Sequence, residues 1–280
     1  MALLEVTRVT VRFGGITAVN DASLSVDLGT ITGLIGPNGA GKTTLFNVIT
    51  GLQSPTSGHV RFKNDDVTKA TVNHRAKMGM GRTFQRLEAF GSLTVRENIQ
   101  VAREIHAGAR NWFSFRKDPK VDELIEVVGL RRYVDHRADS VPTGVARLLE
   151  MARALAIEPK LLLLDEPSSG LDEAETKGFG KLLQQLAADG CAILMVEHDM
   201  DLVMGVCDLI HVLEFGKVIA TGTAAEIRGN RAVQAAYLGF SDAAGIPIPD
   251  DVAAEATAII GAHSASEPTM TLPAVETERR

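Results

Sequence analysis

The stretch at residues 36–44, GPNGAGKTT, carries the residue types that bind phosphate groups. It matches the pattern G-x-x-x-x-G-K-[ST], in which glycines let the backbone turn tightly and approach an anion without a side chain in the way. Successive N–H groups and the start of a following helix then point at phosphate oxygens. Lys42 supplies a positive charge for the β- and γ-phosphates of a nucleotide, and the hydroxyl of Thr43 can ligate Mg²⁺.

The segments on either side of this loop are the ones that must hold it. The apolar run at residues 31–35 indicates a buried strand, and residues 45–49 indicate the helix that follows. A strand, the loop and a helix in this order are the context in which the pattern binds nucleotides. The alternative is a glycine-rich turn that binds nothing, and the context favours nucleotide binding.

Acidic residues and a histidine follow two further apolar runs, near the point where each run ends. Asp165 and Glu166 come directly after the four leucines at 161–164, which are typical of a central parallel strand, and His198 follows the run at 191–196. Sheets of α/β proteins bind their ligands at the carboxyl ends of the strands. Taken alone, the acids mark a strand that meets solvent, and a lone histidine is usually a surface or core residue. Beside a phosphate loop, the acids predict a Mg²⁺ site.

The composition excludes several classes of protein. The chain has 280 residues, 45% of them hydrophobic, which is enough for one large domain or a core with a subdomain. Its net charge of −6 predicts no general attraction to nucleic acid. We find no apolar stretch near the roughly 20 residues that cross a bilayer and no secretory signal at the N-terminus. Cys191 and Cys207 fit no metal-ligand spacing, and Cys191 is typical of a buried small hydrophobe. We therefore expect a reduced cytoplasmic protein that needs another chain to act at a membrane.

The N-terminal region has the alternation of half-buried strands. Residues 3–13 predict strands with turns between them, and 16–19, 22–26 and 59–62 continue the pattern. Phe13 can stack on a purine base, as aromatic faces do elsewhere. Taken alone, however, Phe13 is more typical of a core residue.

The middle of the chain changes character at residues 93–138. Residues 95–105 and 121–128 have helical spacing, so this region predicts a helical subdomain inserted into an α/β core. Between the two helices, residues 110–120 mix aromatic and basic side chains. They could sit near lipid headgroups, but local packing within the subdomain is favoured because three aromatics make a small anchor.

The last part of the chain has a different composition. From about residue 241, alanine, proline, threonine, serine and acidic residues dominate with little periodicity. Residues 241–280 therefore predict a mostly disordered tail. The alternative is a short regulatory helix near 252–262.

The order of these features resembles a known family. The features described above follow one another as they do in the nucleotide-binding domain of ATP-binding cassette (ABC) transporters. In chain order they are Phe13, the loop at 36–44, Gln85, the stretch 141–155, Asp165 with Glu166, and His198. The likeness covers about residues 3–239. Finer stretches resemble the ATP-binding subunits of branched-chain amino acid uptake systems, and urea and amide importers share much of this pattern. These stretches are residues 12–19, 79–85 with their Arg-Thr-Phe-Gln end, 93–98, 197–200 and 236–239.

This resemblance implies a fold and a division of the chain. The fold is α/β, with a P-loop NTPase core, an antiparallel β subdomain and an inserted helical subdomain. Residues 1–240 would form the ABC ATPase domain, with the helical subdomain at about 86–158, and 241–280 would be the tail.

The resemblance also implies a role for each site residue, with ATP and Mg²⁺ as cofactors. Glu166 would be the general base, Gln85 would contact Mg²⁺ and the attacking water, and His198 would hold the γ-phosphate. Catalysis would thus rest on Glu166, His198, Gln85 and Lys42, and Mg²⁺ on Thr43, Gln85 and Asp165. Nucleotide binding would rest on Phe13, which stacks on adenine, and on Val19, Gly36, Asn38, Gly39, Ala40, Gly41, Lys42, Thr43, Thr44 and, in the partner's site, Gly144. Residues 168–172 look like the loop that crosses to the second subunit.

One stretch departs from the family pattern. The signature usually reads Leu-Ser-Gly-Gly-Gln, and the aligned residues here are Val141, Pro142, Thr143, Gly144 and Val145. The serine hydroxyl is absent and Pro142 donates no N–H. In the family this signature closes the partner's ATP site, where losing one hydrogen bond to a charged phosphate costs about 1.5–3 kcal/mol. The hydroxyl of Thr143 could compensate.

Several functions remain open at this point. The leading one is an ATPase that drives transport, paired with a second ABC ATPase subunit in a homo- or heterodimer and with membrane-spanning permease subunits. It would lie at the cytoplasmic face of the plasma (inner) membrane as a peripheral protein, soluble when isolated, with no nucleic-acid partner. The altered signature motivates a second hypothesis, an ATP-binding regulatory partner whose hydrolysis depends on a different subunit. A non-transport ABC ATPase would need long coiled-coil insertions or two cassettes. A P-loop kinase or GTPase fits the spaced acids and His198 less well.

Overall fold

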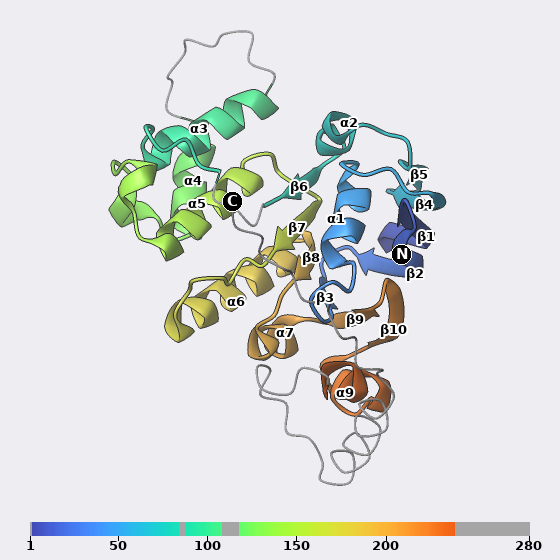
Figure 1. Ribbon diagram of the computed structural model, residues 1–280. Helices are drawn as coiled ribbons and strands as arrows, with labels where there is room; N and C mark the ends of the chain where they lie inside the picture. Colours follow the sequence, from blue (N-terminus) through green and yellow to red (C-terminus); the bar gives the residue numbers. More distant parts are fainter. Residues whose placement is uncertain (1, 84–87, 108–117, 239–280) are drawn as a thin grey trace, which may run out of the picture.

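The fold consists of two β-sheets with a helix between them and further helices on one side. The computed structural model describes residues 2–83, 88–107 and 118–238 (Figure 1). Three of the regions discussed above therefore lie outside the described residues: Gln85, residues 110–117 of the aromatic and basic stretch, and the tail at 241–280. Among the described residues, we find no helix long and apolar enough to cross a membrane.

The larger sheet carries the strands on which the acids and the phosphate loop were predicted. Its order is β10-β9-β3-β8-β7-β6, and its strands pair in parallel except for β10, which is antiparallel to β9. Its strands are β3 (Ile31–Ile35), β6 (Met80–Arg82), β7 (Leu161–Asp165), β8 (Ala192–Val196), β9 (Leu209–Glu214) and β10 (Lys217–Gly222). The strands predicted at 31–35, 161–164 and 191–196 are confirmed.

The smaller sheet is antiparallel in the order β2-β1-β4-β5. Its strands are β1 (Ala2–Phe13), β2 (Ile16–Asp27), β4 (Ser57–Phe62) and β5 (Asp65–Asp66). The prediction of several strands with turns over residues 3–13 is wrong, because β1 runs unbroken through them. Where the β1–β2 register shifts, side-chain hydroxyl groups accept hydrogen bonds from backbone N–H groups. Ser23 Oγ accepts from Arg8 N at 2.9 Å, and Thr10 Oγ1 accepts from Asp21 N at 3.1 Å.

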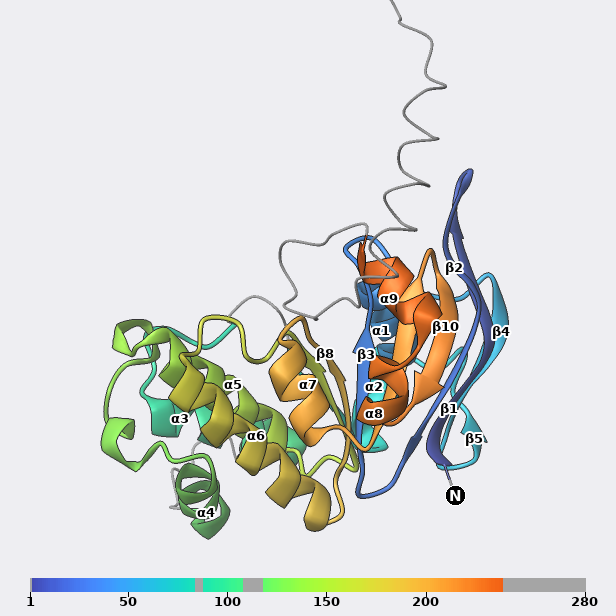
Figure 2. The same cartoon turned by 90° about the horizontal axis from the view of Figure 1, so that it is seen from below.

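The hydrophobic core lies on both faces of the larger sheet. Leu162 and Leu164 of β7 face one cluster, which includes residues of most of the helices, and Leu161 and Leu163 face the other, which includes α1 and the smaller sheet. Figure 2 shows the same arrangement, with α1 between the larger sheet and the β1–β2–β4 layer. Because both faces are covered, the strands are continuous apolar runs.

The helices fall into two groups by position. Those on the far side of the larger sheet from β1 and β2 include α3 (Val95–His106), α4 (Pro119–Val127), α5 (Thr143–Leu155), α6 (Glu173–Ala188) and α7 (Met200–Val206), as Figures 1 and 2 show. The first two confirm the helices predicted at 95–105 and 121–128. The remaining helices are α1 (Lys42–Thr50), α2 (Val72–Lys77), α8 (Ala224–Arg228) and α9 (Arg231–Leu238). The division of the chain into a main domain and an inserted subdomain remains a prediction.

The end of α1 is fixed by a buried arginine on α2. Arg75 is 1% exposed, and its Nη1 donates to Val48 O at 2.7 Å and to Ile49 O at 2.5 Å. Its other nitrogens donate to the carbonyls of Thr68 and Ala70 in the connection between the sheet and α2. The last carbonyls of a helix have no partner within the helix. The Arg75 side chain therefore satisfies Ile49 O and adds to the bond that Val48 O accepts from Gly51 N at 3.2 Å.

Candidate functional site

The phosphate loop is shaped by close contacts that leave no room for a side chain. A Cβ on Gly36 would lie 2.0 Å from Leu213 O, and a Cβ on Gly41 would lie 2.3 Å from Ala18 O. Gly41, directly before α1, also has a φ of 103°, in the left-handed region. Gly36 and Gly41 are thus required by packing as well as by any bound anion, whereas a Cβ on Gly39 would meet no atom within 4 Å.

Neighbouring strands hold the outer part of the loop. Ala40 O accepts from Gly216 N at 2.9 Å, and Gly216 O accepts from Asn20 N at 2.8 Å, so the β9–β10 turn joins the loop to β2. Val19 is fully buried, and its Cγ2 would lie 3.5 Å from a Cβ on Gly41. Asn38, Gly39 and Thr43 are exposed, and Thr44 is half-buried. The loop is therefore anchored at its back and open on the side where a phosphate would arrive.

Lys42 lies inside the curve of the loop. Its Nζ donates to Gly36 O at 2.7 Å and to Pro37 O at 2.9 Å, and the residue is only 7% exposed. Burial lowers the pKa of Lys42, while the negative charges of Glu166 and Asp165 act in the opposite direction. The acids at the end of β7 and the ammonium group of the loop thus share one electrostatic environment, as the sequence predicts.

Asp165, the last residue of β7, forms a buried ion pair. Its Oδ2 lies 3.1 Å from Nη2 of Arg82 on β6, and the two side chains are 6% and 9% exposed. Nη1 of Arg82 also donates to Asn47 Oδ1 at 2.8 Å and to Thr50 Oγ1 at 3.2 Å on α1. Sequence reasoning assigned no role to Arg82. The one signal that could have indicated it is that Arg82 is the charged residue of the Arg-Thr-Phe-Gln stretch at the end of residues 79–85.

Two of the oxygen ligands predicted from the sequence have the chemistry that suits Mg²⁺. The Asp165 carboxylate and the Thr43 hydroxyl are hard oxygen ligands, which Mg²⁺ prefers, and this ion commonly takes one or two protein ligands together with phosphates and waters. No group of three or more His, Cys, Asp or Glu side chains suited to a metal occurs among the residues that the structure describes.

Glu166 and His198 meet at the ends of adjacent strands. Glu166 Oε1 lies 3.0 Å from His198 Nε2. Glu166 N donates to Val196 O at 2.9 Å, and the residue has a φ of 49°. Left-handed backbone in a residue other than glycine is costly and gathers at functional sites. Here it turns the chain at the end of β7 so that the carboxylate of Glu166 meets the imidazole.

Phe13 lies at the exposed end of β1. It is 49% exposed, so its interpretation as a core residue is wrong. The hairpin tip at which it sits leaves one side of the ring without the neighbours that a core provides. The position is compatible with stacking on a base, which stays a prediction.

Gly144 lies apart from the phosphate loop. It is in the first turn of α5, and α5 and α1 are well separated in Figures 1 and 2. No side chain caps the start of this helix. A Cβ on Gly144 would lie 2.7 Å from Glu175 Oε1 of α6, the end of a flexible side chain that can rotate away.

The loop at 168–172 touches the start of α5. Arg147 Nε donates to Ser169 O at 3.4 Å, and a Cβ on Gly170 would lie 3.2 Å from Thr143 Cγ2. The two segments that the resemblance places against a partner subunit are thus in contact with each other in one chain.

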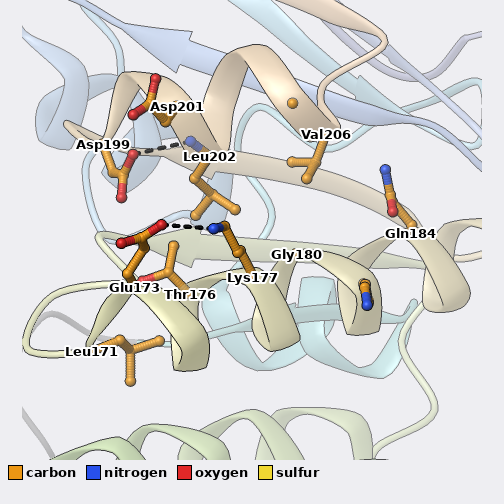
Figure 3. A pocket seen from close by; sticks show the side chains of 12 residues that line it. Leu171, Glu173, Thr176, Lys177, Gly180, Gln184, Asp199, Asp201, Leu202 and Val206 are labelled. Atoms are coloured by element: carbon orange, nitrogen blue, oxygen red, sulfur yellow. Dashed lines mark hydrogen bonds and ion pairs between the residues drawn. The ribbon is translucent and has the colours of Figure 1, made fainter. Parts of the chain in front are cut away.

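A cavity of about 590 Å³ lies between α6 and α7 (Figure 3). Leu171, Gly180, Leu202 and Val206 supply apolar lining, while Glu173 and Lys177 pair above it. None of the site residues predicted from the sequence lines this cavity. The phosphate-binding chemistry therefore lies elsewhere, at the loop and the strand ends.

Comparison with known proteins agrees with this geometry. A family model described as ABC transporter matches residues 19–169, and one described as Branched-chain amino acid ATP-binding cassette transporter matches residues 217–239. The chain is 39% identical over 249 residues to the high-affinity branched-chain amino acid transport ATP-binding protein LivG of Escherichia coli K12, with 85% of this chain and 98% of LivG covered.

Two solved structures of cassettes resemble the chain in fold. One is the ADP conformation of an ATP-binding cassette of an ABC transporter, with a TM-score of 0.77 and 30% identity over 85% of this chain and 99% of that one. Another is a dimeric, post-hydrolysis cassette bound to ADP and phosphate, with a TM-score of 0.71 and 26% identity over 79% of this chain and 98% of that one. The family resemblance and the fold class predicted from the sequence are confirmed: this chain belongs to the ABC transporter family and is one of its ATP-binding, ATP-hydrolysing cassettes.

Proposed function

We propose that this chain hydrolyses ATP to drive an importer of branched-chain amino acids or a related small solute. The observation that carries the catalytic part is the pairing of Glu166 and His198, 3.0 Å apart, beside a lysine whose pKa responds to Glu166. Phosphoryl transfer to water needs a positioned carboxylate, a donor for the γ-phosphate and a cation, and these residues supply them.

The residues divide the work as follows. The N–H groups of the loop and Lys42 bind the phosphates, and Phe13 stacks on adenine. Glu166 orients the attacking water and accepts its proton, and His198 donates to the γ-phosphate while its ring stays fixed against Glu166. Thr43 and Asp165 would hold Mg²⁺, with Gln85 as a further ligand, and the ion would neutralise charge that develops on the phosphates.

A complete site requires a second cassette. The start of α5, with Gly144 and its uncapped N–H groups, would close on the ATP held by the partner. A dimeric relative bound to ADP and phosphate supports this arrangement. The pair would act on membrane-spanning permease subunits at the cytoplasmic face of the membrane. The alternative of a regulatory partner without hydrolysis is not favoured, because the chain carries its own acid, histidine and lysine.

The proposed solute class comes from relatives and from the end of the cassette. LivG is named for branched-chain amino acid transport, and the branched-chain model matches residues 217–239, which hold β10, α8 and α9. This match covers a part of the chain outside the catalytic set, so it adds information about the class of transporter.

The test is Glu166→Gln in the full chain. We expect phosphate release to fall about 100-fold or more, the range of a lost general base, while equilibrium binding of Mg·ATP is retained. Light scattering should show the variant as a dimer with Mg·ATP and a monomer without it. Turnover at the wild-type rate would refute the role of Glu166. For the solute, cells carrying the variant should lose uptake of radiolabelled leucine, isoleucine and valine; loss of urea uptake alone would point to the related importers.

A further inference from the structure

We propose that Glu197 is a positioning residue that ties the intersubunit loop at 168–172 to His198, so that the γ-phosphate contact and the loop move together. This inference rests on the proposed function of Glu166 and His198. Glu197 is not assigned a contact with ATP or with the attacking water. It acts by accepting hydrogen bonds from the backbone N–H groups of Ser168 on one side and of His198 and Asp199 on the other.

The carboxylate of Glu197 is buried and bridges two segments. It is 3% exposed, and its Oε1 accepts from Ser168 N at 2.7 Å. Its Oε2 accepts from His198 N at 3.0 Å and from Asp199 N at 3.4 Å. Among the described residues, all the hydrogen bonds recorded for this carboxylate come from backbone N–H groups.

The bridge stands where the sheet ends. The parallel pairing of β7 with β8 closes at Asp165 opposite Val196, and Val196 O accepts one more bond from Glu166 N. Beyond that point β7 continues into the 168–172 loop and β8 into α7, and no further ladder bond joins them. Beyond the ladder, the two chain segments are joined by the contact of Glu166 with His198 and by the Glu197 carboxylate.

The link extends to the surface expected to meet the partner. Ser169 and Gly170 of the loop contact Arg147 and Thr143 at the start of α5. A shift of the His198 backbone would disturb Glu197, then Ser168, and so the loop and α5. Such a chain of contacts couples sites only if its members have two arrangements, which calls for a measurement.

A carboxylate suits this position better than an amide. Three N–H donors need acceptors on both oxygens, and hydrogen bonds to a charged acceptor are about twice as strong as neutral ones. In Glu197→Gln, the side-chain NH₂ would have to face either Ser168 N or the His198 and Asp199 N–H groups. One side of the bridge would break while the volume stays almost the same.

The test compares Glu197→Gln and Glu197→Ala with Asp201→Asn in the full chain. Asp201 is exposed at the edge of the α6–α7 cavity (Figure 3), so it is a matched loss of charge nearby. We expect kcat for ATP to fall about tenfold in Glu197→Gln and further in Glu197→Ala, since one and then all links are lost, with KM within about twofold. Asp201→Asn should retain the wild-type kcat and KM.

A second readout follows the loop directly. Hydrogen exchange of the amides at 166–172 should slow when Mg·ATP binds to the Glu166→Gln protein. In the double variant Glu166→Gln with Glu197→Gln, Mg·ATP should still bind, but the amides should no longer be protected. A wild-type kcat in Glu197→Gln, a KM that rises in proportion to the loss of kcat, or unchanged protection would overturn the inference. If Glu166→Gln itself turns over normally, the proposed function fails instead. Glu197→Gln carries the test if Glu197→Ala does not fold.

Discussion

Replacing Arg82 with Met should destabilise the fold because it leaves the Asp165 carboxylate buried without its partner. Removing one member of a buried ion pair costs about 3–5 kcal/mol, and both side chains here are less than a tenth exposed. The hydrogen bonds to Asn47 and Thr50 are lost as well, at about 1 kcal/mol each. The flexible Met side chain retains part of the packing of the arginine stem. We expect Arg82→Met to lower the free energy of unfolding by about 5–7 kcal/mol in total.

A double mutant separates the ion pair from the other contacts. Because deleting both charges of a buried pair is often close to neutral, Arg82→Met with Asp165→Asn should recover about 3–5 kcal/mol and leave only the loss of the bonds to α1. Urea unfolding followed by tryptophan fluorescence and circular dichroism gives the free energies. The single variant should also melt about 10–28 °C below the wild type, at about 2–4 °C per kcal/mol for a domain of this size. Equal stability of the single and double variants would refute the reasoning, since the stranded carboxylate would then cost nothing.

Two further outcomes follow from the same structure. Gly41→Ala should abolish Mg·ATP binding in equilibrium dialysis, because its Cβ would lie 2.3 Å from Ala18 O and would displace the loop; wild-type affinity would contradict the close contact. His211, buried on β9, donates or accepts with Thr221 Oγ1 at 2.8 Å, and burial lowers its pKa. Its contribution to stability is therefore complete above the unfolded pKa of 6.5 and is lost as pH falls through the lower folded value. The wild type should lose unfolding free energy over that window more steeply than His211→Gln, and parallel curves would count against the assignment.

The parts of the site that could be predicted from the sequence are those set by local pattern. The phosphate loop and β3 before it are contiguous in the chain, so composition and spacing suffice. Asp165 and Glu166 were placed correctly at the end of β7 because parallel strands buried on both faces are continuous apolar runs. The roles of these residues in ATP hydrolysis remain proposals.

The parts that could not be predicted depend on which segments meet. Arg82 pairs with Asp165 across 83 positions of the sequence, and Glu197 reaches Ser168 across 29. Contacts over such separations produce no repeating pattern of residue types in the sequence, so they cannot be predicted from it. The unbroken β1 was missed for a related reason: the hydroxyls of Thr10 and Ser23, which replace ladder bonds at its register shifts, cannot be distinguished in sequence from those of turn residues.

The Arg75 cap on α1 has a consequence for local opening. The ends of helices ordinarily fray on their own, at a small fraction of the free energy of global unfolding. Here the last turn of α1 can separate only if the guanidinium leaves the Val48 and Ile49 carbonyls, which exposes a cation and detaches α2 at the same time. The two helices, distant in sequence, should therefore open as one cooperative unit. Their amides would exchange with solvent together, and the helix that begins at the phosphate loop would keep its full length through fluctuations that shorten less protected helices.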